Sequence, residues 1–277
     1  MQLFKRFATL LALALALGLA GCASLTLAYN QLPFLGGWWI DSYLDLDSTQ
    51  QARMKEQLRA WQAWHRREEL PQWVALLRQA SDLLDHGTVT ADELLALERA
   101  GRASLERCLQ HAAPLAAPVL ADLRPQQWAH LQNKMEEKHA EWRERNTGRD
   151  GQDERAKRYV TTLERWLGDL DRSTRRQARA EAEAWHFDVA ALSQARATRE
   201  ARTLEALRAW SRQDFASGTA ELMKLAQPLP AEQALRDEGL ASVLKLLNGL
   251  NAQQRDKVRR HWADWTQQLR SLQRSSS

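Results

Sequence analysis

Two short motifs in the sequence have the residue types and the spacing of a metal site. Glu136-x-x-His139 and Glu183-x-x-His186 each place a carboxylate and an imidazole three residues apart, on one face of a predicted helix. Carboxylate-bridged di-metal proteins combine two such motifs with a glutamate from each of two further helices. The sequence offers no clear candidates for those two glutamates. We therefore expect a non-enzymatic protein with no metal and no cofactor, and keep a di-metal carboxylate enzyme as the alternative.

A second group of titratable residues could supply an acid–base pair. Its members are Asp41, Asp45, Asp47, His65, Glu68 and Glu69. Simpler roles are available, because Asp47 is placed to cap a helix and residues 65–69 offer ion pairs at helical spacing. The sequence has no glycine-rich phosphate loop, nucleophile elbow or zinc-type Cys/His cluster. We expect no catalytic residues in this group.

The N-terminal segment has the pattern of an export signal. Lys5 and Arg6 precede a run from residue 7 to residue 20 that is apolar except for one threonine and one glycine, and small residues then lead to Cys22. Such a run is too short to cross a bilayer of roughly 30 Å as a helix. Leu19-Ala20-Gly21-Cys22 resembles the lipobox of bacterial lipoproteins, which implies cleavage after Gly21 and acylation of Cys22. Because Ala23 follows the cysteine instead of aspartate, the enterobacterial sorting rule implies a lipid anchor in the outer membrane, on its periplasmic face.

The composition of the rest of the chain limits the partners and the cysteine chemistry that we expect. Removing residues 1–21 leaves 256 of the 277 residues and lowers the formal charge from +4 to +2, since Lys5 and Arg6 are lost. A nearly neutral protein has no nucleic-acid signature, so we expect no nucleic-acid partner. Once Cys22 is lipidated, Cys108 stands alone, and its apolar neighbours favour a small buried residue over a nucleophile.

The hydrophobic pattern is helical almost throughout and predicts an all-α fold, an elongated multi-helix bundle. We divide the chain into a signal peptide at 1–21, a lipidated tether and aromatic segment at 22–45, a first helical half at 46–148 and a second at 149–277. The aromatic residues after the tether are expected to dock on the helical body or to lie at the membrane interface.

Several local signals set the expected helix boundaries. Thr90 and Glu93 form a capping box for a helix that runs to about Gln110, and Pro114 and Pro118 punctuate the segment after it. A break or kink is expected at Pro71. In the second half, helices are expected at about 155–167, 171–216, 219–226 and 231–248, followed by a last helix.

A Leu-x-x-x-Gln pattern opens helices at Leu46–Gln50, Leu123–Gln127 and Leu250–Gln254, with a degenerate relative at residues 170–174. The residue after the leucine suits a helix cap, and the glutamine reaches back to the cap amide. The spacing suggests a divergent duplication of two helical halves. The alternative, that these are unrelated good helix starts, stays open.

These helix starts resemble the Leu-Thr-x-x-Gln repeats of Spy and CpxP-like periplasmic proteins, which are helical chaperones or stress sensors, although the threonine is missing in every copy. A longer resemblance rests on Tyr29-Asn30, Trp38-Trp39, Asp41, the run Tyr43-Leu44-Asp45-Leu46-Asp47, Gln50 and the run from Trp64 to Pro71. These residues look like the signature of an uncharacterised family of proteobacterial helical lipoproteins. That resemblance implies no catalytic residues.

Together these observations predict a membrane-tethered, non-enzymatic binding or scaffold protein of the cell envelope. Its partners would be the membrane, through the lipid anchor, and a protein or another envelope component. Tryptophan and arginine are frequent at binding hot spots, so a holdase-like chaperone role is one version of this prediction. The competing version buries most of the tryptophans at helix seams and leaves a specific, unrelated partner.

Overall fold

A computed structural model describes residues 23–274, and this part of the chain contains helices and no strand. The prediction of an all-α multi-helix fold is confirmed. In chain order the elements are α2 (Ala23–Asn30), α3 (Leu32–Leu44), α4 (Ser48–Trp64), the π-helical turn η1 (His65–Glu69), α5 (Leu70–Asp85), α6 (Ala91–Ala121), α7 (Pro125–Asn146), α8 (Gly148–Leu167), α9 (Arg172–Ala184), α10 (Val189–Ser211), α11 (Phe215–Leu225), α12 (Pro230–Gly249) and α13 (Ala252–Arg274).

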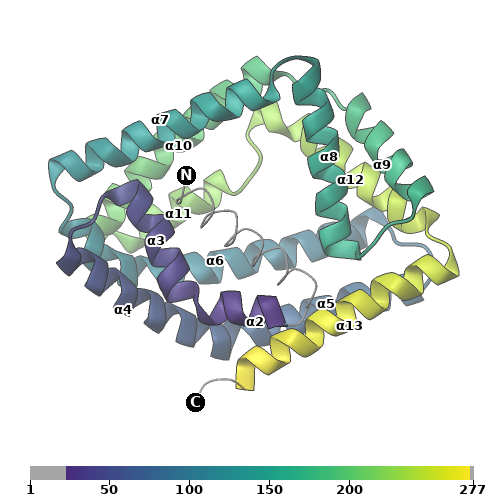
Figure 1. Ribbon diagram of the computed structural model, residues 1–277, viewed down its shortest axis with the longest axis horizontal. Coiled ribbons are helices and arrows are strands. Elements are labelled where there is room, and N and C mark those ends of the chain that lie inside the picture. The colour runs from purple at the N-terminus through teal and green to yellow at the C-terminus, as the bar shows by residue number, and fades with distance from the viewer. Residues whose placement is uncertain (1–22, 275–277) are drawn as a thin grey trace, which may run out of the picture.

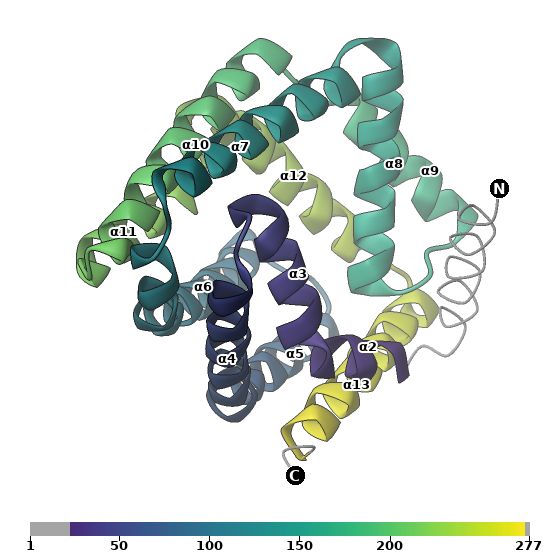
Figure 2. The ribbon, with the colours of Figure 1, turned by 60° about the vertical axis from the view of Figure 1, so that its left-hand side comes forward.

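The helices form the sides of an open frame (Figures 1 and 2). One side holds α7 beside α10, another holds α8 beside α9, and a third holds α13 packed on α5. The segment α2–α3 crosses the face of the frame and packs on α4 and α7. Helices that cross at corners in this way bury their apolar stripes at the corners, so the frame has more than one core.

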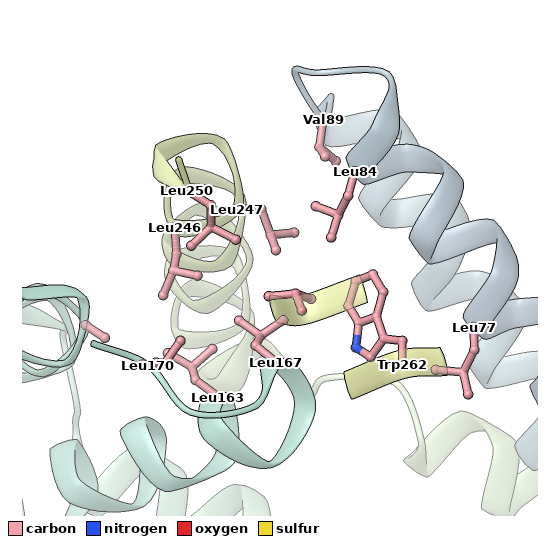
Figure 3. Packing of buried hydrophobic residues seen from close by; sticks show 12 residues of the cluster. Leu77, Leu84, Val89, Leu163, Leu167, Leu170, Leu246, Leu247, Leu250 and Trp262 are labelled. Carbon is pink, nitrogen blue, oxygen red and sulfur yellow. The ribbon is translucent and has the colours of Figure 1, made fainter. Parts of the chain in front are cut away.

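Two separate hydrophobic clusters hold the frame together. The first lies where α3, α4, α6, α7 and α10 meet, and its buried members include Leu44, Leu46, Met54, Val119, Leu131 and Trp210. The second lies where α5, α8, α9, α12 and α13 meet, and includes Leu77, Leu84, Leu163, Leu167, Leu247 and Trp262 (Figure 3). Each cluster joins helices from both predicted halves.

The predicted helix starts come together in pairs. At the first cluster, Gln50 and Gln127 are both buried, and their side-chain amides donate to each other's carbonyl oxygens at 3.2 and 2.8 Å. Gln127 Nε2 also donates to the Asp45 carbonyl at 2.7 Å, and Gln50 Nε2 to the Asp122 carbonyl at 2.9 Å. The glutamines therefore close two helix caps and also join two helices that are far apart in sequence.

The second cluster repeats this arrangement with different side chains. Gln254 Nε2 at the start of α13 donates to the Asp171 carboxylate and to Thr174 Oγ1 at the start of α9. Leu170 and Leu250 are buried here, as their counterparts Leu46 and Leu123 are at the first cluster. Each pair of predicted helix starts therefore anchors one of the two clusters.

The contacts between helices also correspond between the two clusters. α3 packs on α4 and α7, whereas α8 packs on α9 and α13; α5 reaches across to α13, and α10 reaches across to α7. The two halves thus exchange a helix, because α5 completes the second cluster and α10 completes the first. The duplication stays a prediction. Corresponding helix contacts in the two halves are what a duplication would produce.

Some helix boundaries differ from the prediction. The segment expected as a tether is helical as α2 and α3, and α8 begins at Gly148 instead of about 155. The helix expected to end near Gln110 continues through Pro114 and Pro118 to Ala121. The single helix expected over 171–216 is two helices, α9 and α10, with a break at residues 185–188, and α11 begins at Phe215 instead of about 219.

Replacing Gln127 by alanine is expected to lower the free energy of unfolding by about 1–3 kcal/mol. The change removes the hydrogen bonds that Gln127 makes with the buried Gln50 side chain, the Asp45 carbonyl and the Arg124 amide, and the loss of buried hydrogen bonds costs about that much. Urea denaturation checks it. The matched control is Gln254→Ala, whose partners are more exposed and whose loss should be smaller; an equal loss in the two variants would contradict the structural role of the buried pair.

Candidate functional site

A cavity of about 770 Å³, called the central cavity below, is lined by residues from both predicted halves of the chain. Its walls come from α6, α7, α8, α9, α10 and α12 and from the loops before α10 and α12. The volume is within the usual range of small-molecule sites, about 300–1,000 Å³. The charged wall residues are Glu98, Arg102, Arg155, Arg158, Arg196, Arg199, Glu200, Glu232 and Arg236. Six arginines against three glutamates give the cavity a formal excess of positive charge.

The junction between α7 and α8 brings two of these arginines into the cavity. Gly148 adopts a left-handed backbone with φ +73°, which lets the chain reverse at once after Asn146. Gly151 lies so close to the end of α7 that an added Cβ would be 2.7 Å from the Asn146 carbonyl oxygen. The first turns of α8 are thereby held against Asn146, with Arg155 and Arg158 facing the cavity.

The three glutamates of the cavity wall are already paired. Glu98 is within 2.9 Å of Arg102 and 2.5 Å of Arg236, and Glu232 receives two hydrogen bonds from Arg199, at 2.5 and 2.6 Å. Glu200 pairs with Arg196 at 2.9 Å and with His139 Nδ1 at 3.2 Å. These pairs fix the walls and engage four of the six arginines, with Glu98 shared between Arg102 and Arg236.

Arg155 and Arg158 have no carboxylate partner among residues 23–274. Arg155 Nη1 donates to the Asn146 backbone carbonyl at 2.7 Å, and Arg158 Nη2 donates to Asn146 Oδ1 at 2.9 Å. The Arg155 guanidinium also lies over the Phe187 ring, 3.9 Å from its centroid. Burial, together with the like charge of Arg158, lowers the pKa of Arg155. The structure thus holds two neighbouring positive charges without a counter-ion from the described protein.

The two predicted Glu-x-x-His motifs do not form a metal site. Glu136 is exposed and accepts from Gln132, whereas His139 turns toward α10, where its Nε2 lies 2.7 Å from Ser193 Oγ. His186 is exposed in the loop after α9, so Glu183 and His186 are not on one helix face. Among residues 23–274, no three His, Cys, Asp or Glu residues gather where they could hold a metal ion.

The group that could have supplied an acid–base pair makes structural contacts. Asp47 caps α4, the Asp41 carboxylate accepts from the Leu46 amide, and Glu69 is 1% exposed and paired with Arg107 at 2.6 Å. Burial would raise the pKa of Glu69, but hydrogen bonds from Arg107 and Ser104 hold it below its usual value. No cavity wall described includes these carboxylates.

His65 lies in the π-helical turn before Pro71, where the chain was expected to kink. Its Nδ1 is 3.0 Å from Tyr29 Oη, and Arg66 donates to Asn30 Oδ1 at 2.9 Å. Burial lowers the pKa of His65 and raises the pKa of Tyr29 to about 12, so a neutral imidazole faces a protonated phenol. The aromatic signature residues thus fasten α2 to the helical body.

Of the two cysteines, Cys108 is among the residues that the structure describes. Cys22, the predicted lipidation site, lies outside the described residues. Cys108 is half-buried, and burial raises the pKa of its thiol to about 11, which suppresses the reactive thiolate. This agrees with a structural role for Cys108.

The segment that follows Cys22 has an exposed apolar face. Of seven large apolar side chains exposed among the described residues, five are on α2 and α3, namely Leu27, Phe34, Leu35, Trp38 and Trp39. Residues 23–40 contain no charged side chain. No described helix is long and apolar enough to span a bilayer.

Sequence reasoning missed the cavity and its two unpaired arginines. One signal was available: Arg155 has no acidic residue three or four positions away on its helix, so it lacks the usual intrahelical partner. Arg158 carries no such signal, because Glu154 stands four residues before it. Which arginines of other helices find a glutamate depends on the packing of the frame, and no local pattern encodes that.

Comparison with known proteins gives one finding. The model of a protein family, described as "Family of unknown function (DUF6279)", matches residues 42–234, from the end of α3 into α12. No curated protein shows a significant match. No solved structure does so either.

Proposed function

Because the chain belongs to the DUF6279 family, whose function is unknown, we propose its role from the structure: a membrane-tethered, non-enzymatic binding protein of the cell envelope. The predicted membership of an uncharacterised family is confirmed by the family match. Anchoring in the outer membrane through Cys22 and a periplasmic location remain part of the proposal.

The observation that carries this proposal is the central cavity. It is bounded by six helices, has the volume of a small-molecule site, and combines paired charges, unpaired arginines and aromatic rings. The wall is fixed by ion pairs between α6 and α12 and between α10 and α12. A wall fixed in this way is suited to hold one kind of ligand.

The membrane tether is supported by the exposed face of α2 and α3. Tryptophan side chains are favoured where a bilayer meets water, and Trp38 is 69% exposed in the isolated protein. An apolar helix face beside a lipidated residue adds a second attachment to the acyl chains. α2 and α3 are themselves fastened to α4, so this attachment would orient the whole frame.

The distribution of apolar surface favours the cavity over a chaperone-like surface. A holdase for unfolded clients needs broad exposed apolar area. Outside α2 and α3, only Leu105 and Trp166 are large, apolar and exposed among the described residues. The remaining tryptophans are buried or half-buried.

Replacing Cys22 by serine is expected to abolish acyl labelling and to leave the protein either uncleaved or released from the membrane fraction. The physical reason is that stable anchoring needs the buried methylenes of the acyl chains, at about 0.8 kcal/mol each. Metabolic acyl labelling followed by membrane fractionation measures both effects. Cys108→Ser is the matched control and should behave like the wild type. A Cys22→Ser protein that is cleaved and still membrane-bound would contradict the lipid anchor.

The binding role is tested on the tethered protein itself. Extraction from its own membranes in mild detergent, followed by native mass spectrometry, should show an envelope component retained by the folded protein. A folded protein that retains no component from any envelope extract would contradict the binding function.

A further inference from the structure

The chemistry of the cavity defines a class of ligand more narrowly than its volume does. On one wall, Arg155 and Arg158 both bind Asn146, which places the two guanidinium groups side by side. The carboxylates of the cavity are committed to other arginines, at 2.5–2.9 Å. The unmatched charge of this wall therefore has to be balanced by something other than the described side chains.

Guanidinium groups in this arrangement suit a carboxylate or a phosphate. Each guanidinium carries five N–H donors in a planar fork that matches the oxygens of such groups. Arg155 and Arg158 each donate one hydrogen bond to Asn146, so several N–H groups of each guanidinium remain for a ligand. Burial and the neighbouring charge of Arg158 both lower the pKa of Arg155, and a bound anion would offset this penalty.

The remaining wall near these arginines is aromatic and aliphatic. Trp142, Trp185 and Phe187 line the cavity together with Leu192 and Leu235. The Trp142 and Phe187 rings lie 6.3 Å apart between centroids, and Phe187 stacks under the Arg155 guanidinium. Such a surface favours an apolar body next to the anionic group.

A second, almost wholly apolar pocket shares one wall residue with the central cavity. This pocket, of about 330 Å³, lies between α3, α6, α7 and α10 and is lined by residues such as Trp39, Leu131 and Leu207. Thr203 lines both pockets. Apolar volume is therefore available beside the cavity, on the side of the exposed α3 face.

We propose that the central cavity binds an anionic molecule with an apolar body, whose carboxylate or phosphate contacts Arg155 and Arg158 and whose body packs on Trp142, Trp185 and Phe187. This inference rests on the proposed binding function and names the chemical class of its ligand. Two sources share this chemistry: single-chain lipids of the membrane, and soluble aromatic acids.

The test is a titration of the full-length folded protein, followed by isothermal calorimetry and by tryptophan fluorescence. The probes are dodecanoate, benzoate, inorganic phosphate and dodecyltrimethylammonium, whose alkyl chain is similar to that of dodecanoate and whose head group has the opposite charge. Dodecanoate is expected to bind and dodecyltrimethylammonium is not. Tighter binding of dodecanoate than of benzoate would indicate a membrane lipid as the source, and the reverse would indicate a soluble acid.

Replacing Arg155 and Arg158 together by glutamine should weaken dodecanoate binding by about tenfold or more for each lost charged hydrogen bond. Arg149→Gln is the matched control, because Arg149 is exposed on the same helix and does not line the cavity. Should the double variant fail to fold, Arg158→Gln alone loses only the contact with the Asn146 side chain.

Unchanged binding in the folded Arg155/Arg158 variant would overturn the proposal, as would equal binding of the cationic chain. Phosphate that binds as tightly as dodecanoate would also overturn it, since the apolar wall would then contribute nothing. If the probes fail while an envelope component is still retained by the extracted protein, the ligand class is wrong and the binding function stands. If both fail, the proposed function is wrong as well.

Discussion

Trp262→Ala is expected to lower the free energy of unfolding by about 3–5 kcal/mol, the usual cost of removing a buried tryptophan. Trp262 of α13 is buried in the second cluster, between Leu77 of α5 and Leu167 of α8 (Figure 3). Its indole also donates to the Trp166 carbonyl at 2.6 Å. Alanine leaves a cavity where three helices meet and removes the hydrogen bond between α13 and α8.

Calorimetric or urea-induced unfolding measures this loss, with a decrease of about 10 °C in the melting temperature as a guide. Trp38→Ala is the matched control, because the Trp38 side chain is exposed and its removal should change stability by less than about 0.5 kcal/mol. Equal stability of the Trp262 variant and the wild type would mean that α13 does not close the second cluster. The family match ends inside α12, so residues 42–234 lack the helix that completes this cluster.

Gly218→Ala is expected to destabilise the protein by about 3 kcal/mol, at the upper end of the usual cost of overpacking. Gly218 of α11 packs directly on α10, and an added Cβ would overlap the buried Trp210 indole and approach the Ala206 carbonyl oxygen to 2.7 Å. Trp210 cannot yield easily, because its indole donates to Thr219 and packs in the first cluster. The helix α11 therefore has to move away from α10.

Gly101→Ala is the control for helix propensity. Gly101 lies within α6 and has nothing within 4 Å of an added Cβ, so alanine there should stabilise the protein by about 0.5–1 kcal/mol. Thermal unfolding of the two variants should move in opposite directions. A Gly218→Ala protein that melts with or above the wild type would contradict the close packing of α10 and α11.

Helix starts were predictable from the sequence because the cap chemistry is local. Thr90 with Glu93 and Asp47 with Gln50 form the expected capping boxes, since each pair lies three residues apart and needs no distant partner. Asp188 caps α10 by the same chemistry, but no glycine or proline precedes it, so the break before it was missed. Caps alone mark a helix start poorly when the residues before them also favour helix.

Helix continuation depended on packing and was harder to predict. Pro114 and Pro118 each remove a backbone hydrogen bond, yet α6 continues because Ala113, Val119 and Leu120 beside them are buried in the first cluster. That α6 continues through both prolines depends on its packing against α4, α10 and α11, which lie elsewhere in the sequence. The repeat predicted the two helix starts but not the hydrogen bonds between Gln50 and Gln127.

The candidate site was out of reach of sequence reasoning for a related reason. Its walls come from six helices, and its character depends on which arginines lack a carboxylate after packing. The motifs that sequence analysis selected, at His139 and His186, were chosen by spacing along one helix. Spacing identifies neighbours on a helix, whereas this cavity is formed by residues that become neighbours only in the folded frame.

The packing of α13 on α5 has a consequence for how the chain folds. Arg259 and Asp85, which form an ion pair across this contact, are 174 residues apart in sequence. Contacts of such long range raise the contact order, and closing so large a loop is entropically costly, which slows folding. Since α13 is synthesised after all the helices on which it packs, the leucines of α5, α8 and α12 stay without their cover until α13 has been made. Folding of the second cluster therefore has to wait for α13, and until then its apolar surface is open to aggregation.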